Sequence, residues 1–237
     1  MIDKFWPGPL SIILPARTEL PAAVTGGQIG VGLRMPDHRV ALALIEAAGP
    51  LAATSANLSG RPSPTNAQHV REDLDGKIAA VLDAGPTGLG LESSIIDLCK
   101  VPYRWLRPGG VSREQVQEVL DCEILPGLNE SDDLPHYQTK CQVILSEDEA
   151  DFRIQQQYYL KKGMKIILVY NNYYPESNKL EGNISRFLDL NGRDSDLYTL
   201  LRDAERQADV LIFAPLPPEK GSATEAVLDR IRKAARV

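Results

Sequence analysis

The 237-residue sequence has few of the residues that build metal centres or disulfide frameworks. Its three cysteines (Cys99, Cys122 and Cys141) and three histidines are scattered, so it has no CxxC motif and no His/Cys group with metal-ligand spacing. An odd number of widely spaced cysteines also excludes a disulfide scaffold. We therefore predict a cytoplasmic protein with reduced thiols and no metal site built from its own side chains.

The sequence also lacks long hydrophobic runs and an excess of positive charge. No apolar run approaches the ~20 residues that a membrane-spanning helix needs, and the first residues lack the basic start and apolar core of a signal peptide. Lys and Arg number 26 against 32 Asp and Glu, a net charge of -6, which argues against a broad nucleic-acid-binding face. We expect no membrane contact, and RNA contact only through a local basic patch. The remaining composition, 43% apolar and 24% charged, is typical of a globular chain with one large domain or two ordinary ones.

The stretch 51–65 concentrates short polar side chains on a stiff loop. Gly60, Pro62 and Pro64 restrict its backbone to a loop conformation. Its polar residues between positions 54 and 63 are Thr54, Ser55, Asn57, Ser59, Arg61 and Ser63. Short polar side chains and free backbone N–H groups on such a loop suit an anionic ligand, above all phosphate. The alternative is a surface loop without a ligand.

Three further polar turns lie at strand ends. Arg34 follows the expected strand 29–33, Ser93 precedes a strand at 95–98, and Arg107 follows one at 103–106. An arginine at a strand end can bind a carboxylate or phosphate bidentately, although a structural salt bridge is an equal alternative. The nearby Gly-rich loop 85–90 fits neither the P-loop nor the dinucleotide fingerprint, so it does not by itself predict a nucleotide site.

The pattern of expected strands and helices differs on the two sides of a polar segment, which predicts two α/β domains. Residues 1–124 mix strands and helices irregularly, and residues 125–141 form a linker with prolines, a glycine and an acidic patch. From 142 to 237 strands and helices alternate with short connections, which predicts a small parallel sheet. The strand ends of this second domain carry no catalytic motif, so we interpret it as a binding or regulatory module, or as a packing domain without chemistry.

Local signals predict several element boundaries. The expected helices are His38–Ala48 capped by Asp37, a helix through Leu74 capped by Thr65, and Arg113–Leu120 with a Ser112/Gln115 capping box. The apolar run Ile78–Leu82 predicts a short strand. Phe5 and Trp6, beside a Pro-Gly-Pro turn, need a partner surface, and nothing upstream of them in the sequence supplies one.

Several motifs, taken in order, resemble one family. They are Phe5–Leu10, Arg34–Asp37, Ser55–Gly60, Pro62–Thr65, Glu92–Ser94, Leu106–Gly109, Asp196–Tyr198, Pro215–Pro218 and Arg230–Ala235. Together they resemble the YrdC-type threonylcarbamoyl-AMP synthases of tRNA modification, in their two-domain form. The resemblance implies a YrdC-like mixed α/β catalytic domain followed by a small Rossmann-like parallel α/β domain.

The resemblance also implies a reaction and a set of roles. The family condenses L-threonine, bicarbonate and ATP, with Mg²⁺, into threonylcarbamoyl-AMP and pyrophosphate, and a partner transferase then modifies tRNA. Arg34, Ala53 and Ser93 would bind threonine. Ser55, Asn57, Ser63 and Arg107 would bind the nucleotide, Tyr137 would close over it, and Ser55, Asn57 and Arg107 would serve catalysis.

One departure from the family pattern affects the expected activity. The family pairs its Ser-x-Asn element, here Ser55 and Asn57, with an upstream Lys-x-Arg element that this sequence does not contain. We therefore expect that the N-terminal part of the catalytic domain is absent, which leaves the activity of the chain as given open. Two alternatives to the synthase remain: an RNA-binding YrdC-like module without catalysis, and a carbamoyltransferase acting on another acceptor.

Overall fold

The computed structural model describes residues 1–127, 136–174, 184–190, 197–217 and 222–235. The chain divides into two compact units. The first unit comprises Met1–Thr54, Leu91–Glu130 and Gly221–Ala226, and the second comprises Ser55–Gly90, Ser131–Lys220 and Val227–Val237. Part of the expected linker 125–141 lies outside the described residues, so its boundaries stay a prediction.

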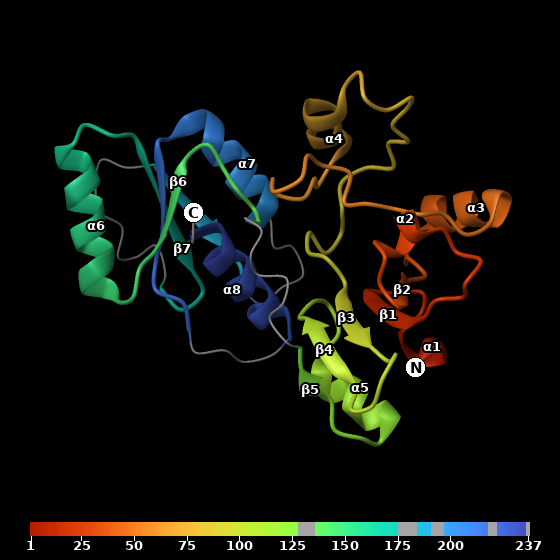
Figure 1. Cartoon of the computed structure of the whole chain (residues 1–237). Helices are drawn as coiled ribbons and strands as arrows, with labels where there is room; N and C mark the ends of the chain where they lie inside the picture. The colour runs from red at the N-terminus through yellow and green to blue at the C-terminus, as the bar shows by residue number, and fades with distance from the viewer. Residues whose placement is uncertain (128–135, 175–183, 191–196, 218–221, 236–237) are drawn as a thin grey trace. The chain divides into compact units, whose positions relative to one another are not determined.

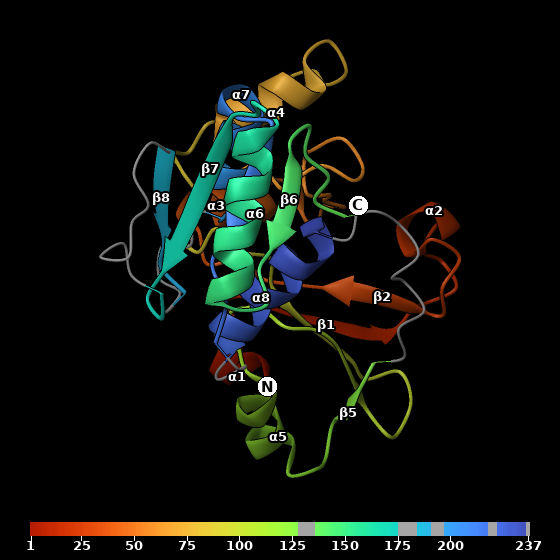
Figure 2. The same cartoon turned by 90° about the vertical axis from the view of Figure 1, so that its left-hand side faces the viewer.

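The first unit contains a mixed five-stranded sheet. Its strands are β1 (Leu10–Pro15), β2 (Gly30–Leu33), β3 (Ser94–Asp97), β4 (Arg104–Arg107) and β5 (Leu125–Pro126), in the order β2-β1-β3-β4-β5. Strands β1 and β2 run antiparallel, as Figure 2 shows, whereas β1 and β3 are parallel. Its helices are α1 (Ile2–Phe5), α2 (Ala22–Thr25), α3 (Arg39–Ala48) and α5 (Arg113–Leu120). The irregular mixture of strands and helices expected for the first half is confirmed.

The core of the first unit forms where β1, β3 and β4 meet α5. Its buried residues are Leu10, Ile12, Ile96, Trp105, Val111, Val116 and Ile124. Phe5 and Trp6 pack against this cluster, and the Trp6 indole N–H donates to the Leu10 carbonyl at 2.7 Å. The partner surface that this aromatic pair was expected to need is supplied by residues that follow it in the chain.

One of the three predicted N-caps is confirmed, and the other two fall on a neighbouring residue. The Ser112/Gln115 capping box is confirmed, with both reciprocal bonds present. Helix α4 (Ala67–Leu74) is capped by Asn66 rather than Thr65, because the Asn66 side chain accepts from the His69 N–H at 3.0 Å. The Thr65 hydroxyl instead contacts the His69 ring. At α3 the N-cap position falls on His38 rather than the expected Asp37, and the His38 side chain forms no capping bond.

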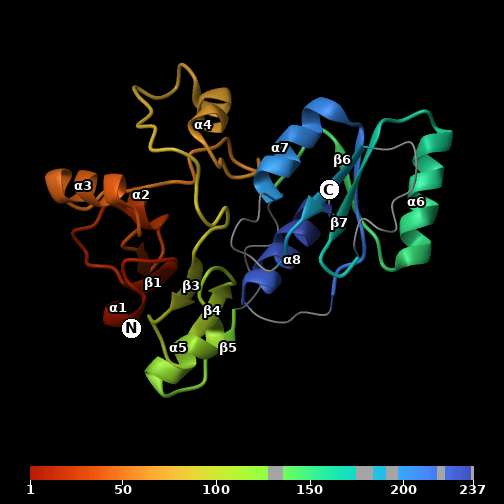
Figure 3. The same cartoon turned by 180° about the vertical axis from the view of Figure 1, so that it is seen from behind.

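The second unit contains a four-stranded sheet that is parallel throughout. Its strands are β6 (Gln142–Leu145), β7 (Ile166–Asn171), β8 (Ile184–Leu188) and β9 (Val210–Phe213), in the order β6-β9-β7-β8. Helix α6 (Glu149–Lys161) covers one face, and α7 (Leu197–Gln207) lies on the other with the part of α8 (Ser222–Ala235) from Val227 onward (Figures 1 and 3). The small parallel α/β sheet that the sequence predicts is confirmed.

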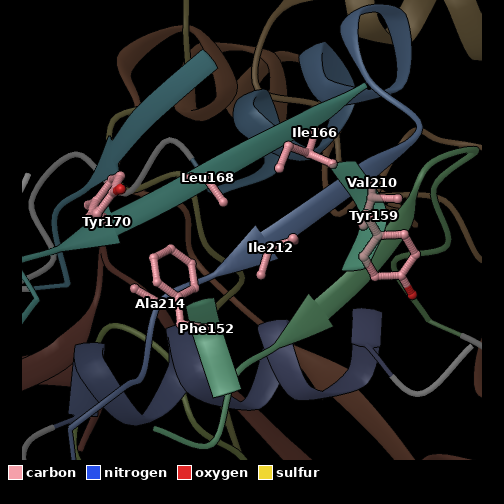
Figure 4. Close-up of a cluster of buried hydrophobic side chains, with 8 residues drawn as sticks. All are labelled: Phe152, Tyr159, Ile166, Leu168, Tyr170, Val210, Ile212 and Ala214. Carbon is pink, nitrogen blue, oxygen red and sulfur yellow. The ribbon is translucent and has the colours of Figure 1, made fainter. Parts of the chain in front are cut away.

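The face of this sheet beneath α6 forms a hydrophobic core. Alternate residues of β7 and β9 point to the same side, where Phe152 and Tyr159 of α6 meet them (Figure 4). The cluster consists of Phe152, Tyr159, Ile166, Leu168, Tyr170, Val210, Ile212 and Ala214. All six residues of β7 are buried, which explains why its sequence reads as a continuous apolar run rather than as an alternation.

The apolar run Ile78–Leu82 does not form the expected strand. It pairs with no strand of the described residues, and the side chains of Ile78 and Leu82 remain exposed. Hydrophobicity alone does not supply the backbone partners that a strand requires. Among the described helices, none combines the length and the apolar character needed to cross a bilayer.

We expect Leu168→Ala to lower the free energy of unfolding by about 2–5 kcal/mol, because it opens a cavity at a fully buried position of β7. Chemical denaturation measures the effect. Ile154→Ala on α6 is the matched control, since Ile154 is 62% exposed and should change stability by less than about 0.5 kcal/mol. Equal effects of the two substitutions would contradict this placement of the core.

Candidate active site

The turn at Gly8 positions the Arg34 guanidinium. The Arg34 Nε donates to the Gly8 carbonyl at 3.0 Å, and the Gly8 N–H donates to the Met35 carbonyl at 2.9 Å. A Cβ at Gly8 would lie 2.3 Å from the Phe5 carbonyl oxygen, so only glycine fits there without a backbone shift. The Pro-Gly-Pro turn and the segment after β2 therefore hold each other, and Arg34 is oriented between them.

A second guanidinium, that of Arg107, is fixed on Ser93. Arg107 Nε donates to the Ser93 carbonyl at 3.0 Å, and its Nη2 lies 3.4 Å from the Ser93 hydroxyl. That hydroxyl also shares a 2.7 Å hydrogen bond with the Ser11 hydroxyl of β1. The sequence analysis assigned Ser93 to threonine and Arg107 to the nucleotide; the structure places the two residues in direct contact, and it adds Ser11, which was not predicted.

Close backbone packing holds the segment that carries Ser93 in place beside Arg107. The buried Ser94 hydroxyl donates to the Val111 carbonyl at 2.6 Å and accepts from the Val111 N–H at 3.1 Å. A Cβ at Gly109 would lie 2.3 Å from the Ser94 nitrogen and 2.6 Å from the Glu92 carbonyl oxygen. The turn after β4 can therefore approach the Glu92–Ser94 backbone only because residue 109 is glycine.

Arg34 and Arg107 are close enough for their charges to interact. Partial desolvation, and then repulsion from Arg107, lower the pKa of Arg34. Arginine remains a cation even so, because its ordinary pKa lies far above neutrality. No carboxylate in the described part of the chain forms an ion pair with Arg34. An anion bound here would relieve the repulsion, so the first unit holds a site suited to a carboxylate or phosphate.

In the second unit, Asn57 presents an unused hydrogen-bond acceptor. Its Nδ2 donates to the Leu58 carbonyl at 2.8 Å and to the Arg61 carbonyl at 3.1 Å. These two bonds determine which end of the amide faces the loop. The Oδ1 is buried, and no hydrogen-bond partner for it occurs among the described residues. A buried acceptor without a donor costs free energy, which a ligand N–H or O–H would recover.

The loop that carries Asn57 is anchored on Asp73 of α4. Asp73 accepts from the Leu58 N–H at 3.3 Å, from Arg61 Nη1 at 2.6 Å and from Arg202 Nη2 of α7 at 2.8 Å. Desolvation alone would raise the pKa of Asp73, but the hydrogen bond and charge of Arg202, the charge of Arg61 and the Leu58 N–H together lower it. The carboxylate is therefore ionised and fully engaged at neutral pH.

Tyr137 lies in the second unit with the loop. Its backbone adopts a φ of 59°, and its ring stacks on Tyr198 of α7 with 5.3 Å between ring centroids. The Gln138 N–H donates to the Gly60 carbonyl at 2.7 Å, which ties the Tyr137 segment to the end of the loop. Closure of Tyr137 over a nucleotide stays a prediction.

The eight predicted site residues divide between the two units. Arg34, Ala53, Ser93 and Arg107 belong to the first unit, and Ser55, Asn57, Ser63 and Tyr137 belong to the second. Within the first unit Arg34, Ser93 and Arg107 are brought together, whereas Ala53 lies exposed outside any helix or strand. Sequence reasoning missed Gly8, Ser11, Asp73 and Arg202, because no local motif marks residues whose partners lie far away in the chain.

These features define a two-unit α/β protein in which one unit holds two neighbouring arginines and the other a polar loop with a buried acceptor that has no partner among the described residues. Residues 1–109 match the Sua5/YciO/YrdC family, described as telomere recombination, and residues 111–236 match the C-terminal domain of threonylcarbamoyl-AMP synthase. The chain belongs to the threonylcarbamoyl-AMP synthase family in its two-domain form.

Individual relatives cover nearly the whole chain. The threonylcarbamoyl-AMP synthases of Bacillus subtilis and Pyrococcus abyssi are each 36% identical to it, over 99% of this chain and 72% of their own length. A crystal structure of P. abyssi Sua5 complexed with L-threonine has a TM-score of 0.81 and 32% identity, covering 99% of this chain and 72% of that one. The implied family and fold are therefore confirmed.

We expect the contribution of Asp73 to stability to depend on pH. At pH 7, Asp73→Asn should lower the free energy of unfolding by about 3–5 kcal/mol, because Arg202 keeps a buried charge without its counter-ion. The pKa of Asp73 is lower in the folded than in the unfolded chain. Its contribution is therefore present above the unfolded value of about 3.9 and is lost as the pH falls through the folded value.

Urea denaturation between pH 7 and pH 3 tests this dependence. The difference between wild type and Asp73→Asn should shrink below about pH 4. Glu72→Gln, which removes a partly exposed carboxylate from the same helix, is the control and should have little effect. A difference that is the same at both ends of the pH range would contradict the assignment.

Proposed function

We propose that the chain is a threonylcarbamoyl-AMP synthase that joins L-threonine, bicarbonate and ATP into threonylcarbamoyl-AMP and pyrophosphate. The observation that carries the proposal is the proximity of Arg34, held on Gly8, to Arg107, held on Ser93, in a chain that is 36% identical over 99% of its length to named synthases. The alternative of an RNA-binding module without catalysis is not favoured, because these relatives are named as enzymes.

Threonine binds in the first unit in this proposal. Arg34 pairs with its carboxylate, since a guanidinium recognises a carboxylate through two parallel hydrogen bonds. The Ser93 hydroxyl is oriented by Ser11 to meet the polar side of the amino acid. A role for Ala53 in threonine binding rests on the family resemblance alone. The P. abyssi structure complexed with L-threonine supports this choice of substrate.

The nucleotide binds to the polar loop of the second unit. Asn57 accepts a hydrogen bond from a ribose hydroxyl or the base at its buried Oδ1, and Ser55 and Ser63 donate to phosphate or ribose oxygens. Arg107 balances the phosphate charge that develops in the transition state. Tyr137 closes over the bound nucleotide.

The chemistry requires positioning rather than a protein nucleophile. The threonine amine attacks bicarbonate carbon, water leaves, and an N-carboxylate forms. A carboxylate oxygen of that group then bonds to the α-phosphorus of ATP, while the bond from this phosphorus to the bridging oxygen breaks and pyrophosphate departs. Orientation and charge neutralisation supply most of the catalysis in such phosphorus chemistry, so the family needs no Ser-His-Asp set.

Mg²⁺ enters with ATP as part of the substrate in this proposal. The described residues contain no group of three His, Cys, Asp or Glu side chains that could hold a metal ion. The triphosphate oxygens would therefore supply most of the ligands of the ion, as is usual for Mg²⁺ at nucleotide sites. When bound, the ion neutralises charge on the departing pyrophosphate.

The product would pass to a transferase that places the threonylcarbamoyl group on tRNA. In this proposal both steps take place in the cytoplasm. The three cysteines are free thiols, as is usual in a reducing compartment.

We expect pyrophosphate release from ATP to require both threonine and bicarbonate. The reason is that the attacking carboxylate exists only after these two have combined. A coupled pyrophosphate assay with each substrate left out in turn measures this requirement. Release that is indifferent to threonine, or turnover of carbamoyl phosphate without threonine, would contradict the proposed function.

We expect Arg34→Gln to weaken threonine binding by about tenfold or more, since a charge-assisted hydrogen-bond pair is worth ~1.5–3 kcal/mol. Isothermal titration calorimetry with threonine measures this loss. Arg39→Gln removes an exposed arginine of the same unit and serves as the control. Unchanged threonine affinity in Arg34→Gln would remove Arg34 from the site.

A further inference from the structure

One face of helix α7 contacts both the polar loop and the Tyr137 segment. Tyr198, Arg202 and Glu205 are spaced four and three residues apart, so they project from the same side of the helix. Thr199, one residue beyond Tyr198, contributes a 2.7 Å hydrogen bond to the hydroxyl of Thr65, at the end of the loop. The helix is thus in contact with the loop along about two turns.

Arg202 holds the loop in two ways. Its Nη2 donates to the Pro62 carbonyl at 2.6 Å and to Asp73 Oδ2 at 2.8 Å, although the residue is only 1% exposed. Asp73 in turn accepts from the Leu58 N–H and from Arg61. The carbonyl of Arg61 and that of Leu58 are the two acceptors that orient the Asn57 amide. A continuous chain of hydrogen bonds therefore leads from Arg202 to Asn57.

Glu205 joins the loop to the Tyr137 segment. One carboxylate oxygen lies 2.6 Å from Arg61 Nη2, and the other accepts from the Lys140 backbone N–H at 3.1 Å. The Tyr137 ring, three residues before Lys140, rests on Tyr198 of the same helix. A single carboxylate thus links the two parts that would contact the nucleotide.

We propose that α7 positions the nucleotide site, with Arg202 and Glu205 as positioning residues and Glu205 as the link between the loop and the Tyr137 segment. The proposal rests on the proposed function, because it takes the loop to be the nucleotide site. A loop already held in its binding shape loses less conformational entropy when the ligand arrives. Loss of either residue therefore weakens nucleotide binding without touching threonine.

The first experiment measures loop order in the ligand-free full chain. Amide hydrogen exchange of residues 57–63 should accelerate about tenfold in Arg202→Lys, which keeps the charge but loses the planar fork, and in Glu205→Gln. Arg206→Gln is the matched control, because Arg206 pairs with Glu72 at 2.9 Å at an exposed position on the same helix. Unchanged exchange in both test variants would overturn the proposal.

The second experiment titrates ATP and threonine separately by calorimetry. ATP affinity should fall about tenfold in both test variants, while threonine affinity and the affinities of Arg206→Gln stay at the wild-type level. An equal loss of affinity for ATP and threonine would overturn the proposal, because it would indicate a purely structural role. Faster amide exchange with unchanged ATP affinity would overturn it for the same reason. Glu205→Gln keeps the test decisive if Arg202→Lys folds poorly.

The two proposals fail in different ways. Wild-type chain that binds threonine but no ATP would overturn the nucleotide role of the loop, and with it the role of α7 in nucleotide binding. Wild-type chain that binds ATP, with variants that bind it equally well, would overturn the positioning role alone.

Discussion

The second unit depends on the buried carboxylate of Asp73. Donors from the loop and from α7 converge on its two oxygens, and the side chain has no exposed surface. Removing a carboxylate and a guanidinium from water costs several kcal/mol per ion, a cost that only a complete set of hydrogen bonds offsets. Movement of the loop away from α7 would break the bonds of Leu58 and Arg61 to Asp73 and that of Arg202 to the Pro62 carbonyl. The local structure around Asn57 follows from this constraint.

Some arginines of the chain form ion pairs with carboxylates, whereas Arg34 forms none within the described residues. Arg61 and Arg202 are neutralised by carboxylates and act as structural links. Arg34 is instead held by a backbone carbonyl and interacts with the like charge of Arg107, an arrangement that an anion would stabilise. In a chain with a net charge of -6, such a local concentration of positive charge is a better guide to ligand binding than the overall composition.

Close packing of backbone, rather than reactive side chains, characterises the first unit. Gly8 and Gly109 allow two turns to approach other backbone atoms where a Cβ would collide with them. The turns in turn hold Arg34 and the Ser93–Ser94 segment. This design suits a reaction that proceeds by orientation and charge neutralisation, because a shift of about 1 Å in the supporting backbone is enough to reduce such catalysis strongly.

The sequence by itself determined the fold class, the parallel sheet of the second unit, the capping box at Ser112 and the family, because these depend on periodicity and on contiguous motifs. It also identified Arg34, Ser93 and Arg107, which the structure brings together. Only the tertiary structure decided that Asn66 rather than Thr65 caps α4 and that Ile78–Leu82 is no strand. It alone paired Asp73 with Arg202, which lie 129 positions apart. A buried charge finds its counter-ion through the packing of distant elements, and no local pattern in the sequence records that choice.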